Sequence, residues 1–160
     1  MSVKEFQTLL FLCTGNFYRS RYAEAWFNVA AARANLHWRA ASAGFRPHIE
    51  ENPLSTWSAE RLLEQGVPLE MTRPAPIKVS EADLTEASLI VSMLEKEHRP
   101  MMLHAFPRWV DRIEYWHVHD IDEVSPAEAL PQIEAQVERL VRSLREGHAL
   151  GVTRHALVEF

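Results

Sequence analysis

Two side chains near the start of this chain have the types and the spacing that oxyanion chemistry needs. Cys13 is the single cysteine among 160 residues, and Arg19 follows six positions later. A cysteine thiolate is a strong nucleophile, and an arginine guanidinium holds a phosphate through two parallel hydrogen bonds. Together they indicate nucleophilic attack on a bound oxyanion.

The segments on either side of this pair predict the elements that must position it. An apolar run at residues 9–12 is typical of a buried β-strand, and a helical pattern begins near Ser20. Backbone N–H groups of a strand-to-helix turn point inward, and the helix N-terminus adds positive potential that would favour the Cys13 thiolate. Gly15 and Asn16 are residue types that tolerate the left-handed backbone of such a turn. The turn is therefore expected to bind an anion.

The same loop resembles the active-site loop of the low-molecular-weight protein tyrosine phosphatases. Five residues carry the resemblance: Cys13, Gly15, Asn16, Arg19 and Ser20. In that family the pattern is Cys-x5-Arg-Ser near the N-terminus, with Gly-Asn at the second and third loop positions. The resemblance implies that Cys13 is the nucleophile and Arg19 the phosphate clamp. The other residues expected to form the substrate-binding cradle are Thr14, Gly15, Asn16, Phe17, Tyr18 and Ser20.

Each of these residues also has an ordinary structural interpretation. A lone cysteine is commonly a small buried hydrophobe, and Arg19 could be a solvated arginine on the first helical turn. A cation there opposes the helix dipole, and a bound anion would remove that cost, so the clamp is favoured. Ser20 is expected to cap the helix, and the resemblance implies in addition a hydrogen bond to the cysteine sulfur. It also implies that the Asn16 side chain stabilises the loop.

The resemblance also places a general acid, an aspartate usually followed by proline, in the loop after the last strand. Asp120 fits because Trp116 precedes it by four residues, a spacing that related chains often have. Asp122 is the alternative, and Ile121 stands where the proline is usual. Both acids also suit a solvated loop or a cap before the last helix.

Departures from the family pattern bear on the substrate. The aromatic residues that usually wall a phosphotyrosine slot are missing after Asp120. Where they do not belong to the core, other aromatic residues are expected to form the walls, namely Phe17, Tyr18, Phe45 or Trp116. Tyr18 stands where many relatives have a second cysteine, so Cys13 has no internal disulfide partner. Ser88 and Leu94 replace usual acidic residues beside the third strand, which we interpret as a surface or capping change of little functional meaning.

Strand and helix patterns alternate along the chain, which predicts a parallel sheet covered on both faces. Strands are expected at residues 8–12, 38–43, 88–93 and 113–118, and helices at 20–35, 53–65, 81–86, 95–104 and 126–146. Pro131 is awkward inside the last helix, whose true start is expected just before it. The resemblance, which covers residues 6–147, implies an α/β flavodoxin-like three-layer sandwich with strand order 2-1-3-4. Residues 1–160 are expected to form one domain with a C-terminal tail at 148–160.

Composition narrows the classes of function. The net charge is −5 and there is no basic patch, which argues against a nucleic-acid partner. We find no stretch long enough to span a membrane and no signal peptide, so we expect a cytoplasmic protein without a membrane partner. A single cysteine fits a reducing compartment. Nothing in the sequence sets the oligomeric state.

A metal site is the competing interpretation of the segment at residues 117–122. His117 and His119 would point to the same side of a strand, and Asp120 and Asp122 follow them. Metal hydrolases need further ligands elsewhere in the chain, and the remaining histidines show no paired spacing. We therefore expect neither a metal nor another cofactor.

Together, Cys13, Arg19 and Asp120 favour a metal-independent phosphomonoester hydrolase that forms a phosphocysteine on Cys13. The expected substrate is phosphotyrosine in proteins. Asp120 would protonate the leaving oxygen and then activate water. The expected partners are a phosphorylated protein or a small phosphomonoester, with inorganic phosphate or another oxyanion binding in the loop. Two alternatives stay open: an arsenate reductase that uses an external thiol, and a weakly active phosphate-binding interaction protein.

Overall fold

The sheet at the centre of the fold has four parallel strands. The computed structural model describes residues 6–47, 54–120 and 123–147. Its strands are β1 (Gln7–Cys13), β2 (Trp38–Gly44), β3 (Leu89–Ser92) and β4 (Glu114–Tyr115). Their order is β2-β1-β3-β4, so the predicted parallel sheet and its strand order are confirmed.

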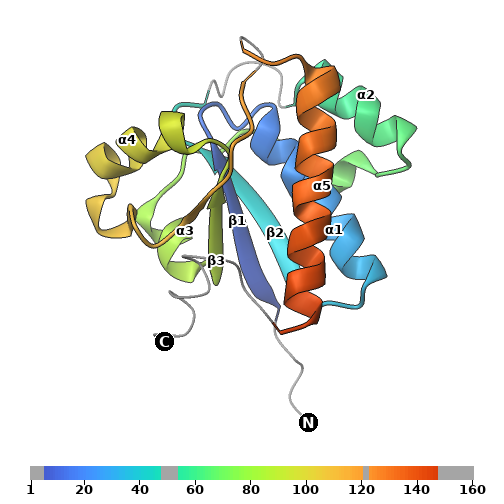
Figure 1. The fold of residues 1–160 in the computed structure, drawn as a ribbon, viewed down its shortest axis with the longest axis horizontal. Helices are drawn as coiled ribbons and strands as arrows, with labels where there is room; N and C mark the ends of the chain where they lie inside the picture. The colour runs from blue at the N-terminus through green and yellow to red at the C-terminus, as the bar shows by residue number, and fades with distance from the viewer. Residues whose placement is uncertain (1–5, 48–53, 121–122, 148–160) are drawn as a thin grey trace.

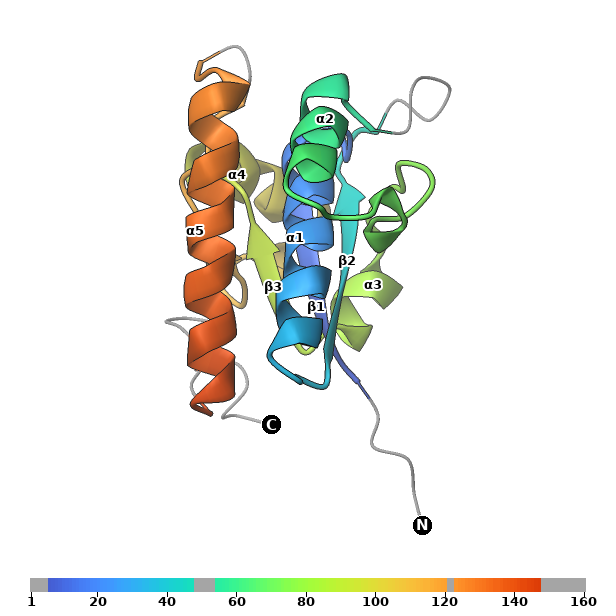
Figure 2. The same cartoon turned by 90° about the vertical axis from the view of Figure 1, so that its right-hand side faces the viewer.

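Helices cover both faces of this sheet, as a three-layer sandwich requires. They are α1 (Arg19–Arg33), α2 (Thr56–Glu64), α3 (Glu81–Glu86), α4 (Glu95–Ala105) and α5 (Pro126–Arg145), with short 3₁₀ turns η1 (Leu69–Met71) and η2 (Pro107–Trp109). In Figure 1, α3 and α4 lie on one side of the strands and α1 and α5 on the other. Figure 2 shows α5 running beside α1, against which it packs. The expected flavodoxin-like architecture is confirmed.

β1 lies inside the sheet, and its side chains alternate between two hydrophobic cores. Leu9 and Phe11 belong to the core formed with α1 and α5, whereas Leu10 and Leu12 belong to the core formed with α3 and α4. All four are almost completely buried, because a parallel strand with helices on both faces has no solvent side. The alternation places the next residue, Cys13, in the first of these cores.

Two elements differ most in length from their predictions. β4 has only two residues of the strand expected at 113–118, because it pairs with β3 over two positions at the edge of the sheet. α2 begins at Thr56, later than expected, since the Ser55 side chain caps it by accepting a hydrogen bond from the Ser58 N–H at 3.1 Å.

α5 continues through Pro131, so the prediction that this helix starts just before that residue is wrong. The helix begins at Pro126, where a missing N–H costs little because the first N–H groups of a helix have no partner within it. Pro131 removes an internal hydrogen bond at a cost of about 3 kcal/mol. Burial of Leu130 and Ile133, which contributes about 2 kcal/mol for each side chain, outweighs this cost.

Some features named in the sequence lie outside the described residues, namely the tail at 148–160 and the pair Ile121 and Asp122. Among the helices that the structure describes, none combines the length and the apolar composition that a bilayer crossing requires. α5 is the longest of them, and charged residues run along its outer face.

Candidate active site

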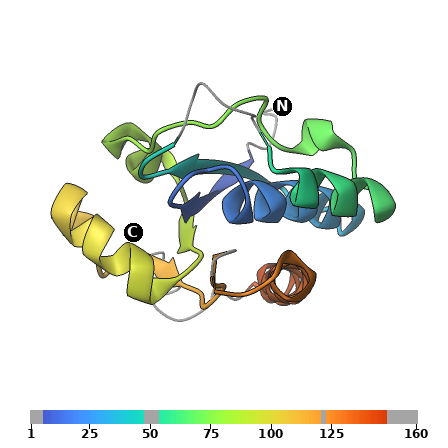
Figure 3. The same ribbon diagram turned by 90° about the horizontal axis from the view of Figure 1, so that it is seen from above.

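The loop between β1 and α1 lies at the carboxyl end of the parallel strands, where ligands bind in sheets of this kind. Figure 3, seen from above, looks down on this end of the sheet and shows the loop leading into α1. Backbone hydrogen bonds join the loop to the segment after β2. The Phe45 N–H donates to the Cys13 carbonyl oxygen at 3.1 Å, and the Arg46 N–H donates to the Thr14 carbonyl oxygen at 2.8 Å. The end of β2 thus braces the loop.

Asn16 holds the loop in shape from inside the protein. Its φ of 51° lies in the left-handed region, which asparagine tolerates, whereas Gly15 does not adopt that conformation. The Asn16 side-chain amide donates to the hydroxyls of Ser20 and Ser42 at 2.9 Å each, and its oxygen accepts from the Ile77 N–H at 2.8 Å. Asn16 is completely buried, so water does not compete for these bonds.

Gly44, the last residue of β2, lets the loop pass close to the sheet. A Cβ at this position would lie 2.8 Å from both the Asn16 nitrogen and the Thr14 carbonyl oxygen. Both neighbours are backbone atoms, which cannot move aside without deforming the loop. Glycine is therefore required for this close approach of two backbones.

The Cys13 sulfur is surrounded by hydrogen-bond donors. The Asn16 N–H donates to Sγ at 3.2 Å, and the Ser20 Oγ lies 2.9 Å from Sγ. Because the Ser20 hydroxyl already accepts from the Asn16 side chain, its own hydrogen is free to point at the sulfur. Such donors stabilise a thiolate, which a small buried hydrophobe would not need.

Ser20 does not cap α1, so that expectation is wrong. The N-cap of α1 is Tyr18, whose side chain makes no capping bond, and Ser20 lies within the first turn. Ser20 is completely buried against the loop. Its hydroxyl lies between the Cys13 sulfur and the Asn16 amide, the place that the family resemblance implied.

The Arg19 side chain is only 2% exposed, so it is not a solvated arginine on the first helical turn. Its Nη1 donates to the Val118 carbonyl oxygen at 2.9 Å, and its Nη2 lies 3.0 Å from Glu97 Oε2 and 3.3 Å from Asp120 Oδ2. Burial opposes the positive charge, but the negative charges of Cys13, Asp120 and Glu97 outweigh burial and raise the pKa of Arg19. The guanidinium therefore stays charged beside the loop.

Asp120, the predicted acid, reaches the loop from a segment far along the chain. Its carboxylate lies 3.3 Å from Arg19 and its side chain is 39% exposed. The structure thus brings together the three residues expected to be catalytic, Cys13, Arg19 and Asp120. A carboxyl group that touches both the loop and solvent can exchange protons with either.

The four aromatic residues considered as slot walls divide into one exposed and three buried side chains. Phe17, in the loop, is 37% exposed. Trp116 packs against Phe11 of β1 with ring centroids 5.6 Å apart, and Tyr18 and Phe45 are buried as well. Phe17 is therefore the one of these four that is accessible at the surface of the loop.

The Tyr18 hydroxyl is buried near Asp120. Among the residues that the structure describes, it has no hydrogen-bond partner. Burial, and then the negative charge of Asp120, raise the pKa of Tyr18 to about 12. The phenol therefore stays neutral and keeps its hydrogen as a donor at the edge of the site.

Glu97, on the first turn of α4, belongs to the site although the sequence did not single it out. Its Oε2 lies 3.0 Å from Arg19 Nη2 and 3.2 Å from His98 Nε2, and it accepts a hydrogen bond from the Thr14 hydroxyl. Burial raises the pKa of this carboxyl, but the three hydrogen bonds outweigh burial and hold the pKa well below its usual range. Glu97 is therefore an anion that shares Arg19 with Asp120.

His98 supports Glu97 from the core. It is completely buried, and its Nδ1 accepts the Leu94 N–H at 3.1 Å, which assigns the proton to Nε2 beside Glu97. Burial lowers the pKa of His98, so the imidazole is neutral. The sequence offered no local signal for Glu97, because its role depends on where α4 packs against the loop.

The metal interpretation of residues 117–122 finds no further ligands in the described part of the chain. There, no three His, Cys, Asp or Glu side chains gather as a metal ion requires. His119 lies 3.9 Å from Glu123, and His117 is exposed.

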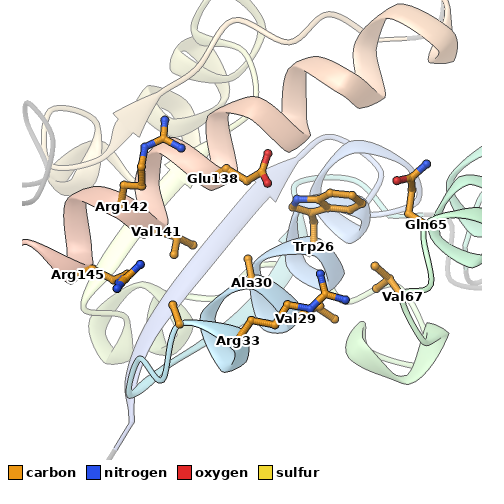
Figure 4. A pocket seen from close by; sticks show the side chains of 11 residues that line it. Trp26, Val29, Ala30, Arg33, Gln65, Val67, Glu138, Val141, Arg142 and Arg145 are labelled. Carbon is orange, nitrogen blue, oxygen red and sulfur yellow. The ribbon is translucent and has the colours of Figure 1, made fainter.

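A groove between α1 and α5 lies far from the loop. Trp26 and Arg33 of α1 face Arg142 and Arg145 of α5 across it (Figure 4), and its volume is about 310 Å³. The groove begins on α1 at Trp26, about 10 Å along the helix from Arg19, and Arg33 at the end of α1 lies about 20 Å from Arg19. The groove takes no part in the candidate active site and offers a remote surface for control variants.

Comparisons with known proteins agree with this geometry. A model of the low molecular weight phosphotyrosine protein phosphatase family matches residues 8–150. The crystal structure of YfkJ from Bacillus subtilis is 24% identical, with a TM-score of 0.79 over 91% of this chain and 99% of that one. The low molecular weight protein tyrosine phosphatase of T. tengcongensis is 26% identical, with a TM-score of 0.71 over 88% and 99%. Vibrio vulnificus Wzb, solved in complex with benzylphosphonate, is 18% identical, with a TM-score of 0.68 over 89% and 99%. None of the curated protein sequences compared with the chain matches it.

Proposed function

Because the chain belongs to the low-molecular-weight phosphotyrosine protein phosphatase family, a family of cysteine-based phosphatases, we propose that Cys13 attacks the phosphorus of a phosphate monoester bound in the loop. The observation that carries this proposal is the environment of the Cys13 sulfur. Sγ accepts the Asn16 N–H at 3.2 Å and lies 2.9 Å from the Ser20 hydroxyl. The buried, charged Arg19 beside the same loop supports it as the clamp for the phosphate.

The proposed substrate is phosphotyrosine in a protein. Phe17, exposed on the loop, supports this choice because it can pack against the phenyl ring of a substrate whose phosphate lies in the loop. A relative, Wzb, was solved with benzylphosphonate, a compound with an aromatic ring close to a phosphonate.

In the first step, the Cys13 thiolate donates an electron pair to phosphorus while the bond from phosphorus to the leaving oxygen breaks. Arg19 and the backbone N–H groups of the loop hold the other three phosphoryl oxygens. Asp120 gives its proton to the leaving oxygen. The products are a phosphocysteine and a phenol.

In the second step, water attacks the phosphocysteine and Asp120 takes up the proton of that water. The bond from phosphorus to sulfur breaks, and its electron pair stays on Cys13. The Ser20 hydroxyl, 2.9 Å from Sγ, donates to the departing thiolate. Inorganic phosphate leaves, and the thiolate is ready for another substrate.

The test of this function is hydrolysis of p-nitrophenyl phosphate and phenyl phosphate with EDTA present. The wild type is expected to hydrolyse both, and Asp120→Asn is expected to lose about 100-fold in kcat/KM on phenyl phosphate, a quantity that reports the first step alone. The loss on p-nitrophenyl phosphate is expected to be smaller, because p-nitrophenolate leaves without needing a proton.

The control for this test is Glu123→Gln, which neutralises an exposed carboxylate close to Asp120 in the sequence and should leave both rates unchanged. Equal losses in kcat/KM on the two substrates would remove Asp120 from the role of acid in the first step. No turnover by the folded, reduced wild type would overturn the phosphatase proposal. Support would then move to arsenate reduction with an external thiol or to phosphate binding alone.

Glu97→Gln is expected to lower kcat for p-nitrophenyl phosphate by about 10-fold without raising KM. The amide keeps the shape of the side chain but removes the charge that orients Arg19. KM should not rise because a negative charge near the substrate dianion is removed at the same time. The matched control is Glu95→Gln on the same helix, where the carboxylate pairs with Arg99 at 2.8 Å on the surface. An unchanged kcat in Glu97→Gln would show that Arg19 needs no such partner.

A further inference from the structure

A second groove, of about 530 Å³, lies beside the candidate active site. Its walls come from the segment after β2, from the segment around Lys78 and from α4. The residues that line it include Phe45, Arg46, Lys78, Glu97, Met101 and Phe106. A groove of this size accommodates one or two side chains of a bound peptide.

Residues that line the groove also contact the phosphate-binding loop. Glu97 lines the groove and also pairs with Arg19 at 3.0 Å. The next wall is tied directly to the loop, since the N–H groups of Phe45 and Arg46 donate to the carbonyl oxygens of Cys13 and Thr14. Successive residues of a peptide lie about 3.8 Å apart. When the phosphate of a substrate peptide is bound in the loop, the residues on either side of the phosphorylated residue therefore lie within reach of this groove.

The charges of the groove favour an acidic partner. Arg46 and Lys78 are exposed, and neither side chain makes an ion pair or hydrogen bond among the described residues. Glu97 is the one acid in the lining, and its charge is offset by Arg19. On a chain whose net charge is −5, this positive character is local, so it selects what binds at this place.

The floor of the groove is apolar. Met101 and Phe106 are half-buried, and they lie beside Val79 and Phe45, which are buried. An apolar side chain that covers this floor would remove it from water. A ligand that fits both the floor and the rim has an apolar side chain next to a carboxylate.

We propose that this groove is a subsite for the phosphorylated protein substrate, and that it takes an apolar side chain and a carboxylate that flank the phosphorylated residue. The proposal rests on the proposed function of the loop and deepens it, because it names which phosphorylated segments are preferred. The loop holds the phosphate, and the groove selects the sequence around it.

The test compares two phosphotyrosine peptides of equal length. One has leucine and glutamate on each side of the phosphotyrosine, and the other has alanine and glutamine at the same positions. The wild type is expected to favour the first peptide by about 10-fold in kcat/KM. In the Lys78→Glu and Arg46→Glu variants the ratio of the two kcat/KM values is expected to fall several-fold, because the rim then repels the carboxylate while the apolar floor is unchanged.

The matched controls reverse charge at the remote groove of Figure 4, with Arg33→Glu and Arg142→Glu, and are expected to keep the wild-type ratio. A ratio near one in the wild type, or a ratio that Lys78→Glu and Arg46→Glu leave unchanged, would overturn the subsite while the phosphatase stands. Failure of the wild type to hydrolyse p-nitrophenyl phosphate would overturn the phosphatase and the subsite with it. The two failures are therefore told apart by one additional substrate.

Discussion

Cys13→Ser is expected to abolish hydrolysis of p-nitrophenyl phosphate, with a loss on the order of 10⁴-fold or more. The reason is chemical, because a serine hydroxyl is not ionised at neutral pH and the loop then holds no strong nucleophile. The serine oxygen still fits between the Asn16 N–H and the Ser20 hydroxyl, which now hold the sulfur. The variant should therefore keep its fold and its ability to bind phosphate.

Three measurements on Cys13→Ser separate lost chemistry from lost structure. Steady-state rates give the loss, calorimetric titration with inorganic phosphate reports the loop, and thermal unfolding reports the fold. On the wild type, rapid acid quench followed by mass spectrometry should find a phosphoryl group on Cys13. A variant that keeps activity within 10-fold of the wild type would refute Cys13 as the nucleophile.

Arg19→Lys is expected to lower kcat/KM for p-nitrophenyl phosphate by between about 10²-fold and 10³-fold. Lysine keeps the charge but loses the planar fork, which in the structure holds Val118 with one nitrogen and Glu97 with the other. An ammonium cannot satisfy these acceptors and the phosphate at once. The affinity for inorganic phosphate, measured by titration, should fall as well.

The matched control for Arg19→Lys is Arg21→Lys, on the same helix. Arg21 is also buried, but it donates to the Thr72 hydroxyl and the Arg73 carbonyl oxygen instead of the loop. Its replacement is expected to lower the free energy of unfolding while leaving kcat/KM unchanged. If both variants lost activity equally, the effect of Arg19→Lys would be one of general packing, and the clamp would be refuted.

Local sequence was sufficient to define the chemistry of the reactive loop. Cys13, Asn16, Arg19 and Ser20 lie within eight consecutive residues between an apolar run and a helical pattern. Local backbone preferences decide how so short a segment folds, and the chemistry of its side chains depends on residue type. For the same reason the alternation of strands and helices could be predicted from local patterns, and this alternation implies the layers of the fold.

Features in which tertiary packing opposes a local preference were harder to predict from the sequence. Pro131 disfavours a helix locally, yet burial of its neighbours keeps α5 intact across it. Serine is a residue type favoured at helix N-caps, yet the Ser20 hydroxyl lies between the Cys13 sulfur and the Asn16 amide. In both cases packing that the local pattern does not contain outweighs the local preference.

Which distant side chains share Arg19 depends on how remote segments pack together. Asp120 and Glu97 come from separate segments, and Glu97 became visible only when α4 was packed beside the loop. Packing also separates the aromatic residues of the core from those at the surface, since Trp116 is buried and Phe17 is exposed. The physical reason is that contacts between remote segments depend on how the sheet and helices pack, and no local sequence pattern encodes those distances.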